Sequence, residues 1–252
     1  MTLRDAFGLK HHGMLSLIGA GGKTTTLFRL ADELYQDGSK VLITTTTKIF
    51  KPMKPHVHRL FLARALDALL SELQKMKAPV IVGTGRELDD AGKLIGLPLE
   101  WFDTLAIKGA MDWLLVEADG AASRPFKVPA EHEPVIPEGS SPTIWVVGIK
   151  VLGHPLTVEW VHRPERALAL LGLERETAVT EDIIVNLIKN PRGCLKGVSP
   201  GSRKVGLINQ ADSEDEVKKA GDLAHTLIRH GFERVVITSY LDDDPVKDVI
   251  TQ

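Results

Sequence analysis

The chain has 252 residues, 43% of them hydrophobic, so it is long enough to bury a large core as one globular unit. Its 31 Lys and Arg against 33 Asp and Glu give a net charge of −2, which excludes a general attraction to nucleic acid or an anionic membrane. The single cysteine excludes an intramolecular disulfide, and no segment resembles a secretion signal or a membrane span, so we expect a cytoplasmic protein with small-molecule or protein partners.

Short apolar runs that alternate with helical patterns predict an α/β fold with a mostly parallel sheet. The predicted strands are residues 14–19, 40–47, 79–83, 113–118, 143–148, 204–209 and 234–239. The predicted helices are residues 27–38, 164–171, 181–189 and 214–230, the last preceded by a Ser213/Glu216 capping box. We therefore predict a single three-layer P-loop NTPase domain over residues 1–252, with a small hairpin insertion at about residues 83–100.

The stretch LSLIGAGGKTTTL, residues 15–27, joins the first predicted strand to the first predicted helix. Inward-pointing N–H groups of a glycine-rich turn and the positive end of a helix together bind phosphate, so this context predicts a phosphate loop. Lys23 would reach the β- and γ-phosphates, and the Thr24 hydroxyl would bind Mg²⁺. The residues predicted to contact the nucleotide here are Gly19, Ala20, Gly21, Gly22, Lys23, Thr24 and Thr25.

The alternative for this stretch is a tight strand-to-helix turn with Lys23 in solvent. We also expect Lys23→Ala to remove triphosphate binding but leave the fold intact, because a loop lysine in solvent contributes little to the core. The spacing G-x-x-G-K-T is two residues shorter than the G-x-x-x-x-G-K-[ST] pattern. The short loop alone does not identify the base.

A site that hydrolyses or transfers a phosphoryl group also needs an acidic residue on a neighbouring strand. Glu117 and Asp119 stand at the carboxyl end of the strand predicted from residue 113, the edge where open α/β sheets bind ligands. We predict that at least one of them binds Mg²⁺ with Thr24 and acts in catalysis with Lys23. The alternative is that Glu117 caps the following turn and Asp119 begins an Asp-Gly bend.

The residues after two later predicted strands resemble elements that recognise the base of a bound nucleotide. Residues 209–212, Asn-Gln-Ala-Asp, resemble the N-K-x-D element of GTP-binding proteins, whose aspartate accepts hydrogen bonds from guanine N1–H and the N2 amino group. Thr238 and Ser239 resemble the T-S-A element, whose backbone N–H contacts the guanine oxygen. We predict Asn209, Asp212, Thr238 and Ser239 as base-site residues, with GTP preferred to ATP. Asn209 and Asp212 could instead form only an Asx turn.

Other polar residues have ordinary alternatives. Thr44 to Thr47 reach the ligand edge of the sheet, although threonine runs are common in plain strands. His132 is a candidate transition-metal ligand or an ordinary loop histidine. For Cys194 we expect a buried or incidental thiol, and for Lys196 a solvated side chain rather than an anion contact.

Several segments together resemble one family over nearly the whole chain. They are GAGGKTT, ITTTT, GKLIGLP, VEADGAASRPFKVPAEHEPVIP, HRPE and LKGVSPGSRKVGLINQAD. They are similar to the selenium-dependent hydroxylase accessory proteins of the YqeC type, and the VEADGA…PAEHEPVIP block is specific. The resemblance implies a bacterial or archaeal P-loop protein associated with maturation of a selenium-dependent molybdenum hydroxylase. Family members often carry lysine at the position of Gln210.

The motif order also resembles that of P-loop metallochaperone GTPases. We therefore expect a Mg²⁺-dependent, GTP-preferring NTPase that acts in cofactor maturation, with a molybdenum hydroxylase or its maturation proteins as partner. Two alternatives stay open. One is a small-molecule kinase or ligase that uses ATP, and the other is a non-hydrolysing, nucleotide-dependent binding module.

Overall fold

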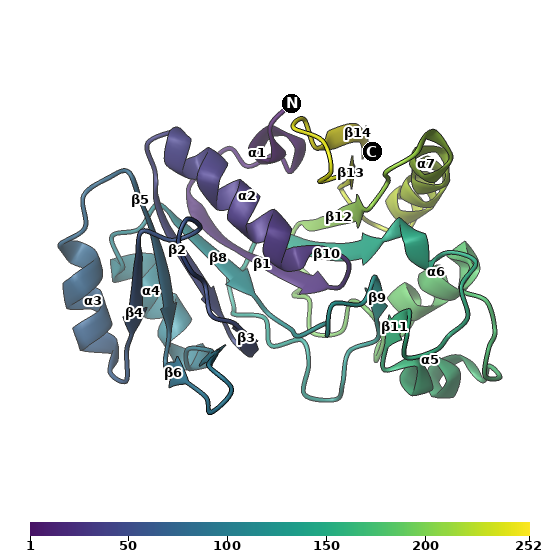
Figure 1. Ribbon diagram of the computed structural model, residues 1–252, viewed down its shortest axis with the longest axis horizontal. Coiled ribbons are helices and arrows are strands. Elements are labelled where there is room, and N and C mark those ends of the chain that lie inside the picture. The colour runs from purple at the N-terminus through teal and green to yellow at the C-terminus, as the bar shows by residue number, and fades with distance from the viewer.

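A nine-stranded sheet runs through the computed structural model, which describes all of residues 1–252 (Figure 1). In chain order the strands are β1 Gly13–Gly19, β2 Lys40–Thr45, β3 Lys48–Phe50, β4 Arg59–Leu62, β5 Val80–Gly85, β6 Glu87–Leu88, β7 Lys93–Ile95, β8 Trp113–Glu117, β9 Phe126–Lys127, β10 Thr143–Gly148, β11 Val161–His162, β12 Lys204–Asn209, β13 Arg234–Thr238 and β14 Val246–Thr251. The large sheet has the order β14-β13-β12-β10-β1-β8-β2-β5-β4. Only the β13–β14 pair is antiparallel.

Helices cover both faces of this sheet. They are α1 Leu3–Ala6, α2 Lys23–Gln36, α3 Leu66–Gln74, α4 Phe102–Lys108, α5 Pro164–Leu171, α6 Glu181–Lys189 and α7 Glu214–Arg229, with 3₁₀ turns η1 Leu99–Trp101 and η2 Ile149–Val151. Side chains of α1 and α2 pack with Leu15 and Leu17 on one face, and those of α6 and α7 pack with Ile18 and Trp145 on the other. The predicted α/β class with a mostly parallel sheet between helices is confirmed.

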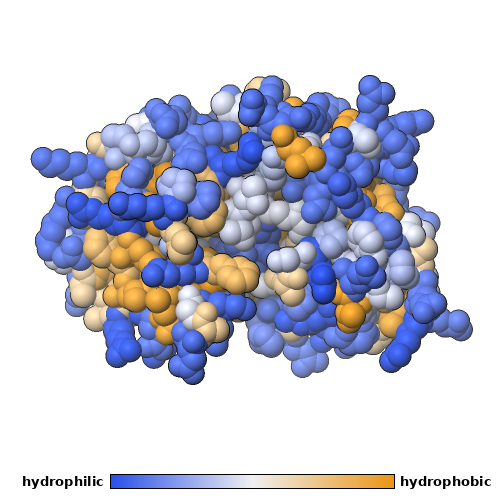
Figure 2. All heavy atoms as spheres, in the orientation of Figure 1, coloured by the Kyte–Doolittle hydropathy of each residue, from blue (hydrophilic) through white to orange (hydrophobic).

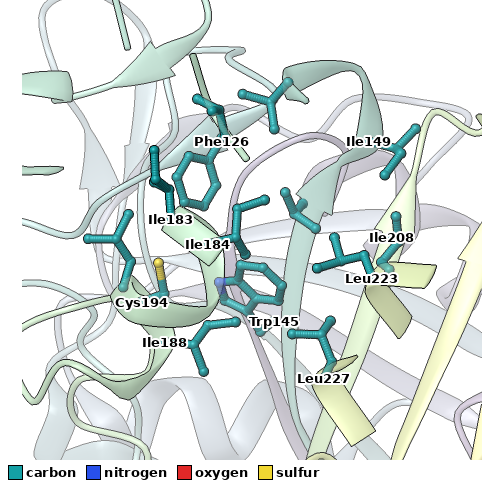
Figure 3. Close-up of a cluster of buried hydrophobic side chains, with 14 of the residues drawn as sticks. Phe126, Trp145, Ile149, Ile183, Ile184, Ile188, Cys194, Ile208, Leu223 and Leu227 are labelled. Atoms are coloured by element: carbon teal, nitrogen blue, oxygen red, sulfur yellow. The ribbon is translucent and has the colours of Figure 1, made fainter. Parts of the chain in front are cut away.

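The strands at the centre are buried on both faces, which explains why they read as continuous apolar runs. In β1 every residue after Gly13 is buried, and β10 is buried throughout. Figure 3 shows part of the largest hydrophobic core cluster, in which Phe126, Ile184 and Leu227 lie around Trp145. Cys194 lies in this cluster, so the expected buried thiol is confirmed.

Two small sheets flank the carboxyl end of the large sheet. β3, β7 and β6 form an antiparallel sheet, and the β6–β7 pair lies within residues 83–100. β9 and β11 pair in parallel on the other side of β8 and β1 (Figure 1). The predicted strand 40–47 ends earlier, at Thr45, because the chain bends there and begins β3 at Lys48.

The surface in Figure 2 is mostly hydrophilic, and apolar side chains gather at the end of the molecule where β3 and β4 lie. Phe50, the last residue of β3, is 72% exposed, and Met53 is 64% exposed. None of the helices combines the length and apolar character needed to cross a bilayer.

Candidate functional site

The glycine loop after β1 takes a backbone path that side chains would block. Gly21 has φ +89°, and a Cβ atom there would lie 2.3 Å from the nitrogen of Gly148 and 2.7 Å from the carbonyl oxygen of Pro125. Gly22 has φ +142°, and its Cβ would lie 2.3 Å from Nδ2 of Asn209. Both positions therefore require glycine, for conformation and for space.

This loop also leaves a row of hydrogen-bond donors without partners. None of the five consecutive backbone N–H groups from Gly21 to Thr25 donates a hydrogen bond to another atom of the protein. The helix α2 that follows has no side-chain N-cap and no acidic residue in its first turn. The free N–H groups and the positive end of the helix make the loop suited to bind an anion.

Lys23, the first residue of α2, is not the solvated side chain that the alternative interpretation described. It is only 3% exposed, because its Nζ lies 3.0 Å from Oδ1 of Asp119, 3.9 Å from Oε1 of Glu117 and 2.5 Å from the carbonyl oxygen of Gly19. The expectation that Lys23 contributes little to the core is therefore wrong. Two buried carboxylates depend on its charge.

Glu117 and Asp119 both lie beneath the glycine loop, in different positions. Glu117 ends β8, and its Oε2 accepts a hydrogen bond from the Thr24 hydroxyl at 2.9 Å. Burial raises the pKa of Glu117, and the Lys23 charge opposes that rise. Asp119 lies beyond the strand end, and its Oδ2 accepts a hydrogen bond from the Gly19 N–H at 3.0 Å. The first carboxylate therefore lies beside the predicted Mg²⁺ ligand Thr24, and the second supports the loop backbone.

A chain of ion pairs continues from Asp119 away from the loop. Lys127 Nζ lies 3.1 Å from Oδ2 of Asp119 and 2.8 Å from Oε2 of Glu133. Glu133 in turn accepts two hydrogen bonds from the Arg163 guanidinium, at 2.7 and 3.2 Å. Burial opposes ionisation of Glu133, but Lys127 and Arg163 lower the pKa of its carboxyl to about 2. We refer to Lys23, Asp119, Lys127, Glu133 and Arg163 as the ion chain.

The sequence did not predict the ion pairs of Lys127, Glu133 and Arg163. The available signal was their position in the segments FKVP, AEHEP and HRPE, which carry the family resemblance. Their pairing was hidden because the partners come from separate segments, and Arg163 precedes α5 in a left-handed conformation with φ +66°.

The four predicted base-site residues lie together at the ends of β12 and β13. Asn209 donates from Nδ2 to the carbonyl oxygen of Gly21 at 2.7 Å and accepts at Oδ1 from the Thr238 hydroxyl at 3.0 Å. Asp212 accepts at Oδ1 from the Ser239 hydroxyl at 2.6 Å. Its Oδ2 lies 2.6 Å from Nζ of Lys150, a residue after β10 that the sequence interpretation missed.

Asp212 is ionised in this arrangement. Burial acts to raise the pKa of Asp212, but the hydrogen bonds from Lys150 and Ser239 lower it. The N–H of Ser239 already donates to the carbonyl oxygen of Pro245 at 2.9 Å. That donor is therefore occupied within the protein, in contrast to the free donor that the T-S-A resemblance implies.

Gln210 lies near the glycine loop, against Gly148, whose backbone nitrogen approaches Gly21. It has φ +66°, and its Oε1 atom is buried without a hydrogen bond. The side chain lies so near Gly148 that a Cβ at this glycine would be 2.0 Å from Oε1. Gln210 thus occupies the position next to the loop where the resemblance places a lysine.

The remaining candidates have structural roles or no partners. The hydroxyls of Thr44, Thr45 and Thr46 donate to the carbonyl oxygens of Thr84, Glu117 and Val135, respectively. The hydroxyl oxygen of Thr47 lies 3.3 Å from that of Thr45. Lys196 is half-buried, and its Nζ donates to the carbonyl oxygens of Ala130 and Glu131. Burial raises the pKa of the Cys194 thiol to about 12.

No group of three or more His, Cys, Asp and Glu side chains is arranged to hold a metal ion. His132 is exposed and joins no such group. The side chains beside the glycine loop that could bind a metal ion are the Thr24 hydroxyl and the Glu117 carboxylate, both of which are hard oxygen ligands. This small set fits Mg²⁺, which proteins bind through one or two side-chain oxygens together with water and substrate phosphates.

A cleft of about 610 Å³ opens in front of the glycine loop. It is lined by residues 21–25 and Glu117, by residues of β3 and β7, and by residues 162–163. The loop 120–124 completes the lining.

Comparisons with known proteins agree with the resemblance. The model of the YqeC protein family matches residues 15–165. A protein of Escherichia coli strain K12, described as "Uncharacterized protein YqeC", is 33% identical over 231 residues, which cover 92% of this chain and 89% of that relative.

Proposed function

The chain belongs to the YqeC protein family, and from its glycine loop we propose that it is a Mg²⁺-dependent P-loop nucleoside triphosphatase that prefers GTP. The single observation that carries the proposal is the row of five free N–H groups, Gly21 to Thr25, above a buried lysine. The first N–H groups of a helix need a side-chain cap, water or a ligand as their partner, and this helix has no side-chain cap. A triphosphate supplies both the acceptors and the negative charge.

In this proposal Lys23 turns from Asp119 and Glu117 towards the β- and γ-phosphates when nucleotide binds. Thr24 and Glu117 would hold Mg²⁺, which offsets the charge of the phosphate oxygens when bound. Asp119 keeps the Gly19 N–H and Lys127 in place, so the loop retains its shape when Lys23 moves. Water attacks the γ-phosphorus, the bond to the β–γ bridging oxygen breaks, and nucleoside diphosphate and inorganic phosphate result.

The preference for GTP is supported by Asp212. Its carboxylate is ionised and held by Lys150 and Ser239 at the ends of three neighbouring strands, next to the loop contact of Asn209. Guanine offers N1–H and N2 amino donors to such a carboxylate, whereas adenine does not. The family resemblance further supports a role in maturation of a selenium-dependent molybdenum hydroxylase.

A second candidate is a small-molecule kinase or ligase, and the cleft in front of the loop favours it. The cleft of about 610 Å³ extends from the glycine loop to β3, β7 and Arg163, so it offers room for an acceptor beside the terminal phosphate. In a kinase, an acceptor oxygen in the cleft would attack the γ-phosphorus in place of water. The products would be the phosphorylated acceptor and nucleoside diphosphate.

Titration of the purified protein with GTP and ATP, with and without Mg²⁺, followed by measurement of product, tests the proposal. We expect Mg²⁺-dependent binding with GTP preferred, and slow release of phosphate. Thr24→Val should weaken the Mg²⁺ dependence, whereas Thr25→Ala, which keeps its N–H, is the matched control. Absence of binding to either nucleotide would overturn the phosphate-loop assignment, acceptor-dependent product would favour the kinase, and binding without turnover would favour a binding module.

A further inference from the structure

The cleft reaches beyond the residues assigned to the nucleotide. None of the four proposed base-site residues, Asn209, Asp212, Thr238 and Ser239, lines it. It begins at the glycine loop and Glu117, where the terminal phosphate would lie, and continues between β3 and β7 on one side and Arg163 on the other. The space next to the terminal phosphate is therefore not used by the nucleoside.

The lining of this space is rich in positive charge. The cationic side chains are Lys23, Lys48, Lys93, Arg124 and Arg163, and the carboxylates are Glu117 and Glu133, an excess of three positive charges. Both carboxylates already lie against cations, Glu117 beside Lys23 and Glu133 between Lys127 and Arg163. Burial and the neighbouring Arg163 lower the pKa of His162, so this histidine neither adds to nor offsets the charge at neutral pH.

Arg124 and Lys93 are the two cations of the lining that form no ion pair, and Lys93 Nζ lies over the ring of Phe50 whereas Arg124 has no such partner. Its side chain is half-buried, and it has neither an ion pair nor a side-chain hydrogen bond. The two residues before it, Ala122 and Ser123, have φ values of +46° and +57°, an unfavourable conformation for residues with a Cβ. The carbonyl oxygen of Pro125, which follows, lies so near Gly21 that a Cβ there would be 2.7 Å from it. Arg124 is thus an unpaired cation of the cleft lining, in a segment whose next residue lies against the glycine loop.

One wall of the cleft is apolar as well as cationic. Phe50 lines it and is 72% exposed, and Lys93 Nζ lies 5.2 Å from the centre of its ring. An exposed phenylalanine beside lysines offers an organic anion a surface for its carbon skeleton.

We propose that this cleft binds a second substrate beside the terminal phosphate of the nucleotide, and that this substrate is an organic anion held by Arg124 and packed against Phe50. Guanidinium groups bind carboxylate and phosphate oxygens in pairs of parallel hydrogen bonds, which suits Arg124 to either group. The volume of the cleft falls in the range of small-molecule sites. This inference rests on the proposed function, because the second substrate is located relative to the bound nucleotide.

The test uses the full chain loaded with Mg²⁺ and a non-hydrolysable GTP analogue, so that the glycine loop is filled. Phenyl phosphate, benzoate and inorganic phosphate are then titrated in separate calorimetric experiments, which distinguish a phosphate group, a carboxylate group and a bare ion. We expect saturable binding of at least one organic anion, at least tenfold tighter than that of inorganic phosphate. Arg124→Gln should weaken this binding at least tenfold, and Phe50→Ala should remove the advantage over inorganic phosphate.

Arg192→Gln is the matched control, because Arg192 is exposed, has no ion pair and lies outside the cleft lining. Binding of the GTP analogue is measured first in every variant, and Arg124→Gln should leave it within threefold of the parent. If the analogue binds but neither organic anion does, or if Arg124→Gln binds them as the parent does, the second site is wrong. If the analogue does not bind to the parent, the proposed nucleotide function fails first.

Discussion

Asn209 donates a hydrogen bond of 2.7 Å from its amide nitrogen to the carbonyl oxygen of Gly21, a residue 188 positions earlier in the sequence. The same amide accepts the Thr238 hydroxyl, so the ends of β12 and β13 are joined to the glycine loop through one buried side chain. The strand ends that we assign to the base therefore also set the shape of the phosphate site.

Replacing Asn209 should consequently affect all nucleotides alike. We expect Asn209→Ala to lower the free energy of unfolding by about 1–3 kcal/mol, because the Gly21 carbonyl and the Thr238 hydroxyl lose a buried partner. Affinity for GTP and ATP should fall by similar factors in calorimetric titration. Asn186→Ala, at an exposed position on α6, is the control. A loss confined to GTP would instead make Asn209 a base-reading residue.

Lys23→Ala should abolish triphosphate binding and also destabilise the protein. The structural reason is the burial of Asp119 and Glu117, which would keep their charges without this partner. Urea unfolding of Lys23→Ala, Asp119→Asn and the double variant measures the coupling between the two residues, and the double variant should lose less stability than the two single losses added together. The phosphate-loop assignment fails if calorimetric titration of Lys23→Ala gives the parental affinity for every nucleotide.

The two acidic residues should separate in function. Glu117→Gln should spare most nucleotide binding but strongly reduce Mg²⁺-dependent turnover, because the carboxylate beside Thr24 loses its charge. Asp119→Asn should cost about 3–5 kcal/mol of unfolding free energy, since Lys23 and Lys127 are both buried against it. Phosphate release measures the turnover of both variants, and urea unfolding measures their stability. Parental turnover in both variants at saturating Mg²⁺ would remove this pair from the site.

Base preference should depend on Asp212. We expect the parent to bind GTP at least about tenfold tighter than ATP, on the scale where 1.4 kcal/mol is a factor of ten. Asp212→Asn should shift the preference towards xanthine nucleotides, because an amide donates to the xanthine C2 oxygen. Competition titrations with GTP, ATP and XTP measure this shift. Equal affinity of the parent for GTP and ATP, or an unchanged preference in the variant, would favour the ATP-dependent kinase or ligase.

Acid should weaken the fold through Glu133. Its folded-state pKa of about 2 lies below the ordinary value of 4.5, so the unfolded chain binds more protons between these values. The stabilisation is complete above about pH 4.5 and is lost as pH falls towards 2. In urea unfolding, Glu133→Gln should show a smaller fall in stability from pH 5 to pH 3 than the parent does. Glu131→Gln, at the exposed neighbouring position, should follow the parent.

Much of the fold could be predicted because the central strands and the long helices have local signals. β1 and β10 are apolar throughout, and the predicted capping box at α7 is present, with the Ser213 hydroxyl accepting from the Glu216 N–H. The edge strands β4 and β14 were not predicted. β4 has only three consecutive apolar residues, Leu60 to Leu62, and Lys247 and Asp248 interrupt the apolar residues of β14, so neither segment has the longer apolar run of the central strands.

The candidate site also contains residues that could be predicted from the sequence and residues that could not. Lys23, Thr24 and Glu117 lie together because they follow neighbouring parallel strands, and motif order was sufficient to group them. Lys127 could not be placed, because a lysine between apolar residues gives no sign that two carboxylates from other segments will surround it. Lys150 was missed for a similar reason, since its partner Asp212 lies 62 residues further along the chain.

The ion chain also has a consequence for the order in which the protein folds. Its members stand at positions 23, 119, 127, 133 and 163, so the last carboxylate, Glu133, gains Arg163 only after the segment before α5 has docked. Contacts between such distant segments form after the loop-closure entropy has been overcome. Until then Glu133 lacks one of its two cationic partners, and the ion chain that leads to Asp119 beneath the glycine loop is incomplete. Competence to bind nucleotide should therefore appear late in folding, together with docking of residues 126–163, all of which lie inside the span that the family model matches.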